Sequence, residues 1–477
     1  MTTAAMAYEG VVPDRRQRLL ILVVCSMSLL IIGLDATIVT VALPDIQRSF
    51  HSSLSGLQWT VDAYTLALAS LLMLAGSTAD RVGRRRVFQA GLVLFSLGSL
   101  LCALAPDLEL LIAFRVVQAI GGAMLSPVAM SIVRNVFEDP RERAQAIGVF
   151  AAMFGISMAL GPVLGGFLVA AISWRAIFVV ALPVAVAAIA LTARFVPESR
   201  APRPRRIDPV GQVLVIGALA GLTFAIIEGG RVGFGAAGIV IVLAVALGCF
   251  VALVRYELRR REPLLEMRFF TSAPFAGAGA IALCLSAALG GFLFMNTLYL
   301  QDVRGLSPLQ AGLYMLPTAT MMIVFAPVSG RLVGRFGARP SMLAGGVAVL
   351  AAGLMLTGLA PGTSVPFLLG AYAVFGFGFA LVSPPIANTA VSGMPPAQAG
   401  VAAAVATTSR QVGITLGVAV FGAIVAAGGG LAQATRPGWW IVAALGLAVA
   451  VLGYVTTTGW ARESARSTAE RLEARVG

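Results

Sequence analysis

The chain has 477 residues, of which 58% are hydrophobic and only 12% are charged. Soluble globular proteins carry about 25% charged residues, so this composition excludes a water-soluble protein and predicts an all-α membrane protein. The formal net charge is +13, and all 34 Lys+Arg residues are arginines. Arginines in short loops between apolar spans indicate membrane topology, so the basic charge gives no reason to expect a nucleic-acid partner.

Fourteen apolar runs long enough to cross a bilayer follow one another along the chain. They lie near residues 19–43, 57–77, 87–105, 110–132, 144–170, 176–193, 209–228, 235–254, 273–299, 309–330, 340–360, 366–388, 399–427 and 437–460. With the N-terminus in the cytoplasm, 27 arginines fall on the cytoplasmic side and five on the outer side. The positive-inside rule therefore predicts that both termini are cytoplasmic.

An internal repeat indicates how these spans are organised. The Gly/Arg pattern of residues 76–86, after the second span, recurs 254 residues later, after the tenth span. Two six-helix bundles, spans 1–6 and 9–14, with a two-helix insert between them would produce this repeat. The predicted segments are a cytoplasmic N-terminus (1–18), the N-terminal bundle (19–200), the insert with its flanking loops (201–268), the C-terminal bundle (269–460) and a cytoplasmic tail (461–477).

The loop after the second span contains more than positive charge. Its notable residues are Gly76, Asp80, Arg81, Gly83 and Arg84. A simple basic loop would need only arginines, whereas glycine permits a tight turn and aspartate can cap a helix or pair with arginine. We interpret this loop as a conformational hinge that locks one state of the protein.

Charged residues inside the spans identify candidate functional positions. A charge at the bilayer centre costs roughly 2.5–3.5 kcal/mol on insertion scales. At about 1.5 Å per residue, Asp35, Asp62 and Arg115 fall in one layer of the outer half of the membrane. Asp35 and Arg115 can pair there, either as a static ion pair or as a proton or substrate site. Asp62 has no obvious partner, and both interpretations stay open for it.

Two further spans have unusual residues. The fifth span contains Gly155, Gly161, Pro162, Gly165 and Gly166, which permit close helix approach and a kink, whether for packing alone or for function. Arg410 lies near the middle of the thirteenth span and has either a structural or gating role or a place on the substrate path. Glu228 lies at the end of the seventh span, and we predict that it is solvated there.

The cysteines and the histidine of the sequence argue against an enzyme or a metal site. The four cysteines lie in apolar runs without paired spacing, and His51 is the single histidine. A catalytic dyad or a metal site needs a nucleophile with a base, or several ligands together. We therefore expect no metal, no other cofactor and no enzymatic activity.

From about Arg15 to Trp460 the chain resembles the major facilitator superfamily, and within it the fourteen-helix drug:proton antiporter group. The motifs that carry the resemblance are Leu34-Asp35-Ala36-Thr37, Gln58-Trp59-Thr60-Val61-Asp62-Ala63-Tyr64, the Gly76 to Arg86 loop, Arg115-Val116-Val117-Gln118, Gly161-Pro162-Val163-Leu164-Gly165-Gly166, Leu298-Tyr299-Leu300-Gln301 and Ser409-Arg410-Gln411. The resemblance implies that Asp35 takes part in proton coupling, that Arg115 is the family's arginine of the fourth span, and that the Gly-Pro motif marks an antiporter.

These implications lead to an expected function. The protein is expected to export amphipathic or cationic organic compounds, such as drugs or antibiotics, by proton-coupled antiport across the cytoplasmic membrane of a bacterium. It would act as a monomer among membrane lipids, with the proton gradient as its energy source. The expected substrate path includes Trp59, Tyr64, Gln118, Asn296, Tyr299 and Arg410.

Other functions remain as alternatives. Export of one endogenous metabolite or self-made antibiotic would use the same fold. A channel would have no use for a hinge loop with Asp80 and Arg81, and uptake of sugars or peptides would call for a more polar or aromatic cavity.

Overall fold

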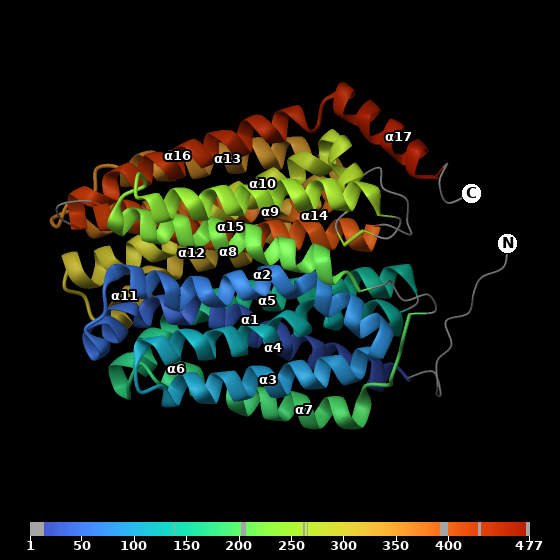
Figure 1. The fold of residues 1–477 in the computed structure, drawn as a ribbon, viewed down its shortest axis with the longest axis horizontal. Helices are drawn as coiled ribbons and strands as arrows, with labels where there is room; N and C mark the ends of the chain where they lie inside the picture. The colour runs from blue at the N-terminus through green and yellow to red at the C-terminus, as the bar shows by residue number, and fades with distance from the viewer. Residues whose placement is uncertain are drawn as a thin grey trace.

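A computed structural model describes residues 14–137, 139–201, 207–260, 263–264, 266–391, 399–427 and 431–473. These residues form helices that run side by side along one long axis, and they contain no β-strand (Figure 1). Thirteen helices within them are long and apolar enough to cross a membrane. The remaining predicted span, 144–170, lies in a helix whose residues Ile156–Ala171 are also apolar. The predicted all-α membrane fold is therefore confirmed.

The first helices pack against one another as a bundle. They are α1 (Arg15–Phe50), α2 (Leu54–Val82), α3 (Arg84–Leu104), α4 (Leu108–Val136), α5 (Pro140–Ala171), α6 (Ala176–Val179) and α7 (Leu182–Phe195). Helix α1 contacts α4, α5 and α7, and α4 also packs on α2 and α3. The sixth predicted span is divided into α6 and α7, because Pro183 lacks a backbone N–H and begins a new helix more easily than it continues one.

The last helices form a second bundle. They are α10 (Ala273–Leu298), a π-helical turn (Tyr299–Val303), α11 (Pro308–Tyr314), α12 (Leu316–Phe336), α13 (Ala338–Leu356), α14 (Val365–Val391), α15 (Ala399–Ala427) and α16 (Leu431–Val455). Helix α17 (Gly459–Glu473) follows, and it packs on α10 and on a 3-10 turn (Met267–Thr271). The tenth predicted span is divided into α11 and α12 near Pro317.

Helices α8 (Pro209–Val232) and α9 (Ala237–Arg259) lie between the two bundles in the sequence. They pack on each other, and α8 also contacts α2 of the first bundle and α15 of the second. The Gln212 side chain of α8 donates a hydrogen bond to the Ser70 carbonyl of α2 at 2.7 Å. Helix α8 is therefore in contact with both bundles.

The same turn occurs once in each bundle. Gly83 separates α2 from α3 with a φ of 129°, and Gly337 separates α12 from α13 with a φ of 80°. Residues other than glycine rarely adopt such positive φ values. The two glycines are 254 residues apart, so the sequence repeat corresponds to a repeated backbone conformation.

The two bundles meet mainly at one end of the molecule. We call the end where α1 begins and α16 finishes the terminal end, and the end where α1 finishes the opposite end. A buried apolar cluster joins residues of both bundles at the opposite end, including Ile38 and Trp174 from the first and Leu285 and Phe292 from the second. A second cluster, around Phe88 in the half nearer the terminal end, contains residues of the first bundle only.

Candidate functional site

Asp35 of α1 and Arg115 of α4 form an ion pair inside the first bundle. Asp35 Oδ2 and Arg115 Nη1 are 2.7 Å apart, and the side chains are 5% and 1% exposed. Two charges this deeply buried are costly unless each is paired and hydrogen-bonded. The structure therefore brings together the acid and the arginine that the sequence places at one depth.

Gln118, one helical turn after Arg115, contacts both members of the pair. Its Nε2 donates to Asp35 Oδ1 at 2.9 Å and to Ser99 Oγ of α3 at 2.7 Å. Its Oε1 accepts a hydrogen bond from Arg115 Nη1 at 2.6 Å. Asp35, Arg115 and Gln118 thus form a closed ring of hydrogen bonds, and Gln118 itself is fully buried.

Helix α2 supplies the remaining contacts of Arg115. Arg115 Nε donates to the Thr60 carbonyl at 3.2 Å. The guanidinium carbon lies 4.1 Å from the centre of the Tyr64 ring, a distance at which a cation is attracted to the ring face. Arg115 is therefore held by α1 on one side and by α2 on the other.

Asp62 lies on α2, apart from this ring of hydrogen bonds. The residue is 0% exposed, and neither carboxylate oxygen has a hydrogen-bond partner among the described residues. Thr65, one turn further along α2, accepts a hydrogen bond from Thr415 of α15 at 2.9 Å. Asp62 thus stands one turn from a polar contact between the two bundles.

Residues 76–86, predicted as a hinge loop, form the end of α2, the Gly83 turn and the start of α3, and they bind the linker that follows α7. Asp80 pairs with Arg84 at 2.8 Å, Arg81 is exposed, and Gly76 faces Pro127 of α4. Glu198 was not among the predicted site residues. Its carboxylate accepts hydrogen bonds from the backbone N–H groups of Arg85 at 3.0 Å and Arg86 at 3.3 Å. These groups form the first turn of α3, where a carboxylate is favoured.

Backbone contacts extend this attachment. Arg84 N donates to the Ser199 carbonyl at 2.9 Å, and Ala201 N donates to the Asp80 carbonyl at 3.0 Å. A side chain at Gly83 would come within 2.7 Å of the Glu198 carboxylate. Gly83 is therefore needed both for its positive φ and for the room it leaves to Glu198.

The small residues of α5 face two different helices. A side chain at Gly161 would overlap Thr37 of α1, and one at Gly165 would come within 2.7 Å of Ile38. Gly166 faces the other bundle, where a side chain would overlap the Pro308 carbonyl of α11. The Pro162 carbonyl in turn occupies the space beside Gly312 of α11. The surroundings of Gly155 lie outside the described residues.

Two glutamines join the bundles in the half nearer the opposite end. Gln58 Nε2 donates to the Ala419 carbonyl of α15 at 2.9 Å, and Gln301 Nε2 donates to the Val41 carbonyl of α1 at 2.8 Å. A side chain at Gly422 would overlap the Gln58 amide. Since the acceptors are backbone carbonyls, the glutamine side chains determine these contacts.

The other residues expected on the substrate path are not brought together. Trp59 donates to Glu228 of α8 at 3.4 Å. Asn296 is buried and accepts a hydrogen bond from Tyr372, and Tyr299 donates to the Ala360 carbonyl at 2.7 Å. Arg410 is partly exposed on α15. Asn296 and Tyr299 therefore point into the packing of the second bundle.

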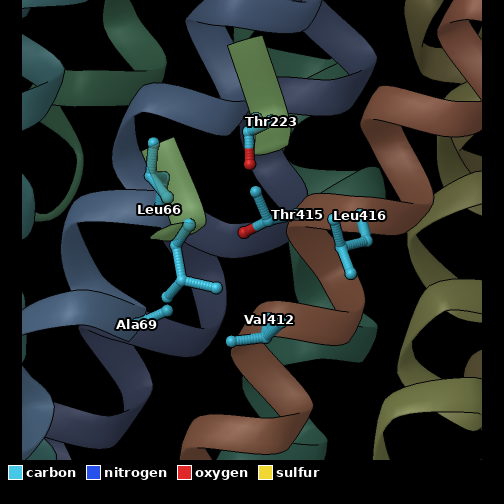
Figure 2. A pocket seen from close by; sticks show the side chains of 7 residues that line it. Leu66, Ala69, Thr223, Val412, Thr415 and Leu416 are labelled. Carbon is cyan, nitrogen blue, oxygen red and sulfur yellow. The ribbon is translucent and has the colours of Figure 1, made fainter. Parts of the chain in front are cut away.

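A small crevice lies where the two bundles and the insert meet. Figure 2 shows side chains of α2 and α15 facing each other there, with Thr223 of α8 above them. Its lining residues are Leu66, Ala69, Leu219, Thr223, Val412, Thr415 and Leu416. The lining is apolar except for two threonine hydroxyls.

Comparisons with known proteins agree with this architecture. The family model described as Major Facilitator Superfamily matches residues 25–213 and 209–418. Among solved structures, the D-xylose-proton symporter has a TM-score of 0.67 with 15% sequence identity, covering 91% of this chain and 97% of its own. At that identity the likeness concerns the fold alone.

Curated relatives are similar over most of their length. The chain is 38% identical to the Multidrug resistance protein Stp of Mycobacterium tuberculosis (strain CDC 1551 / Oshkosh) over 413 residues, which cover 86% of this chain and 76% of that one. It is 37% identical to the Methylenomycin A resistance protein of Streptomyces coelicolor over 395 residues, 82% of each chain. With the family model matched twice along its length, the chain belongs to the major facilitator superfamily.

Proposed function

We propose that the protein exports amphipathic or cationic organic compounds, such as drugs or antibiotics, across the cytoplasmic membrane of a bacterium in exchange for protons. The observation that carries this proposal is the buried pair of Asp35 and Arg115. When the cationic partner of a buried carboxylate moves away, the neutral form becomes favoured and the carboxylate binds a proton. The names of the similar proteins, which are drug-resistance proteins, support export as the direction of transport.

Transport would proceed by rocking of the two bundles about a central site. The contacts of Gln58, Gln301 and Gly166 between the bundles would close the opposite end. By the arginine distribution this end faces outward, and both termini are cytoplasmic. We retain the segments 1–18, 19–200, 201–268, 269–460 and 461–477 as the domain organisation, and a monomer without cofactor or enzymatic activity as the working unit.

Asp62 would be a second acid in the proton path. An ionised carboxylate without a partner is expensive inside a membrane protein, so proton binding would lower the cost of its burial in this state. The hinge loop with Asp80 and Arg81 would bias the equilibrium between conformations.

Export of a single dedicated compound is the alternative. This alternative is supported by the Methylenomycin A resistance protein, whose name gives a single antibiotic. A second similar protein is the Tetracenomycin C resistance and export protein of Streptomyces glaucescens, whose name also gives a single compound. The number of unrelated compounds exported would distinguish the two functions.

The test uses a pump-deficient bacterial host that expresses the wild-type protein, Asp35→Asn or Asp45→Asn. Asp45 is the matched control, because it lies on the same helix and pairs with Arg48 near the helix end. We expect resistance to several toxic compounds from the wild type and from Asp45→Asn, abolished by an uncoupler, and none from Asp35→Asn. Uncoupler-sensitive resistance at the wild-type level from Asp35→Asn would refute the assigned proton site.

A further inference from the structure

We propose that Gln118 is a positioning residue that couples protonation of Asp35 to release of Arg115, by rotation of its side-chain amide. The inference rests on the proposed function, because it assumes that Asp35 gains and loses a proton during transport. It assigns to Gln118 a role in coupling in place of a role in substrate contact.

The hydrogen bonds in the structure fit an ionised Asp35. Both carboxylate oxygens receive donors, Oδ2 from Arg115 and Oδ1 from Gln118. The Gln118 oxygen accepts from Arg115, and its second N–H reaches Ser99. Each of these polar groups therefore has its complement, as buried groups require.

Protonation of Asp35 at Oδ1 breaks this pattern. A proton that arrives from water turns Oδ1 into an O–H donor, which then faces the N–H donor of Gln118. Arginine stays protonated in proteins and has no acceptor, so Arg115 cannot resolve the conflict. Gln118 can, because a half turn of its amide exchanges the nitrogen and oxygen positions and offers Oε1 to the new O–H.

The same half turn removes Arg115 from the ring. It places the Gln118 N–H groups against Arg115 Nη1, where the oxygen at 2.6 Å had been. Two donors repel at that distance, and the neutral acid attracts the guanidinium less than the carboxylate did. Arg115 then keeps the Thr60 carbonyl, the Tyr64 ring and a weaker hydrogen bond to Asp35 Oδ2. Protonation thus loosens the attachment of Arg115 to α1 and leaves its contacts with α2 in place.

Ser99 accommodates both orientations of the amide. A hydroxyl group both donates and accepts, and its hydrogen rotates freely. Ser99 Oγ accepts from Gln118 Nε2 in the structure, and after the half turn it can donate to Oε1. Gln118 therefore keeps a hydrogen bond to Asp35 and one to Ser99 in both orientations, and the bond to Arg115 is the one that the half turn removes.

Few titratable groups near Asp35 could interact with its proton in place of Gln118. Arg115 faces it from α4, and Tyr64 of α2 and Cys102 of α3 interact with it electrostatically. Of the other helices that pack on α1, the sequences of α6, α10 and α11 contain no charged residue, and those of α5 and α7 carry charge only near their ends at the terminal end. Among these groups Tyr64, whose hydroxyl oxygen can accept a hydrogen bond, is the alternative to Gln118 as the partner of the Asp35 O–H, and Asp62 is the other acid on α2.

The test is an infrared difference spectrum between low and high pH on the purified full-length protein without substrate. The C=O stretch of protonated Asp35 is assigned by its loss in Asp35→Asn, and the guanidinium stretch of Arg115 by its loss in Arg115→Lys. We expect both bands to change with one pH midpoint in the wild type. Gln212→Leu, which loses another buried glutamine hydrogen bond, is the control and should behave as the wild type.

Gln118→Glu is the decisive variant. Its carboxylate accepts from Arg115 and from protonated Asp35 at once, so no rotation is needed and Arg115 stays bound. We expect the Asp35 band to persist and the guanidinium change to be smaller than in the wild type, because only the direct contact with Asp35 still responds to the proton. Gln118→Leu, which can neither donate nor accept, should show the same reduction, whereas Tyr64→Phe should keep both bands.

The outcomes separate this inference from the proposed function. No Asp35 protonation band in the wild type would overturn both. An Asp35 band accompanied by an unchanged guanidinium shift in Gln118→Glu, or by loss of that shift in Tyr64→Phe alone, would overturn the role of Gln118 and leave proton coupling at Asp35 intact.

Discussion

Removing one member of the buried ion pair should destabilise the protein more than removing both. Asp35 and Arg115 are 5% and 1% exposed, so water cannot solvate the partner that is left behind. Breaking a buried pair from one side typically costs about 3–5 kcal/mol, while replacing both members by apolar residues is often neutral. Asp35→Ala and Arg115→Met should therefore each lower stability by an amount in that range.

The contacts around Arg115 set the order within this range. After Asp35→Ala, Arg115 keeps the Thr60 carbonyl, the Gln118 oxygen and the Tyr64 ring, and a desolvated cation–π contact contributes about 2 kcal/mol. After Arg115→Met, Asp35 keeps only the Gln118 donor of this ring. We expect Arg115→Met to be the less stable of the two single variants.

The assay is thermal unfolding in one detergent of the two single variants and the double variant. The double variant should unfold at a higher temperature than Arg115→Met. The surface pair Asp45 and Arg48, in which Arg48 is 70% exposed, is the matched control, and its double-mutant coupling should stay below about 1 kcal/mol. Additive losses at Asp35 and Arg115 would refute the argument that each charge depends on the other.

Three further variants test other parts of the account. Asp80→Asn weakens the 2.8 Å pair with Arg84 and should lower turnover while substrate affinity, measured on the same preparation, stays unchanged; a large loss of affinity would place Asp80 at the binding site. Gly166→Leu should abolish export because its side chain would overlap the Pro308 carbonyl of α11. Gly370→Leu is the control and should not abolish export, because a side chain there has no neighbour within 4 Å. Full export by Gly166→Leu would show that α5 and α11 need not be in contact. Gln58→Leu removes a 2.9 Å contact between α2 and α15 and should widen the distance between spin labels on these helices at the opposite end; an unchanged distance distribution would exclude Gln58 from closure.

The helices could be predicted from the sequence because each apolar run is long enough to cross a bilayer. The depth of Asp35 and Arg115 could also be predicted, since helical rise converts residue number into height. The breaks between α6 and α7 and between α11 and α12 were not predicted. Hydropathy continues through them, although Pro183 and Pro317 were visible signals.

The partners of the candidate residues were harder to predict. Which side of a helix meets which neighbour depends on helix rotation, and lipid-facing and buried sides in a membrane are both apolar. Ser99 and Glu198 were therefore missed, although Glu198 follows α7 and binds the start of α3. For the same reason the hydrogen bonds of Asn296 with Tyr372 and of Tyr299 with the Ala360 carbonyl could not be predicted, and their place on the substrate path stays a prediction.

Proton exchange is tested most directly in liposomes that contain the purified protein and a pH-sensitive dye. A gradient of ethidium, an organic cation, is imposed without any proton gradient, and the internal pH is followed. We expect protons to move opposite to ethidium in the wild type, and no proton movement in Asp35→Asn. Downhill ethidium flux through the wild-type protein without proton movement would contradict this expectation.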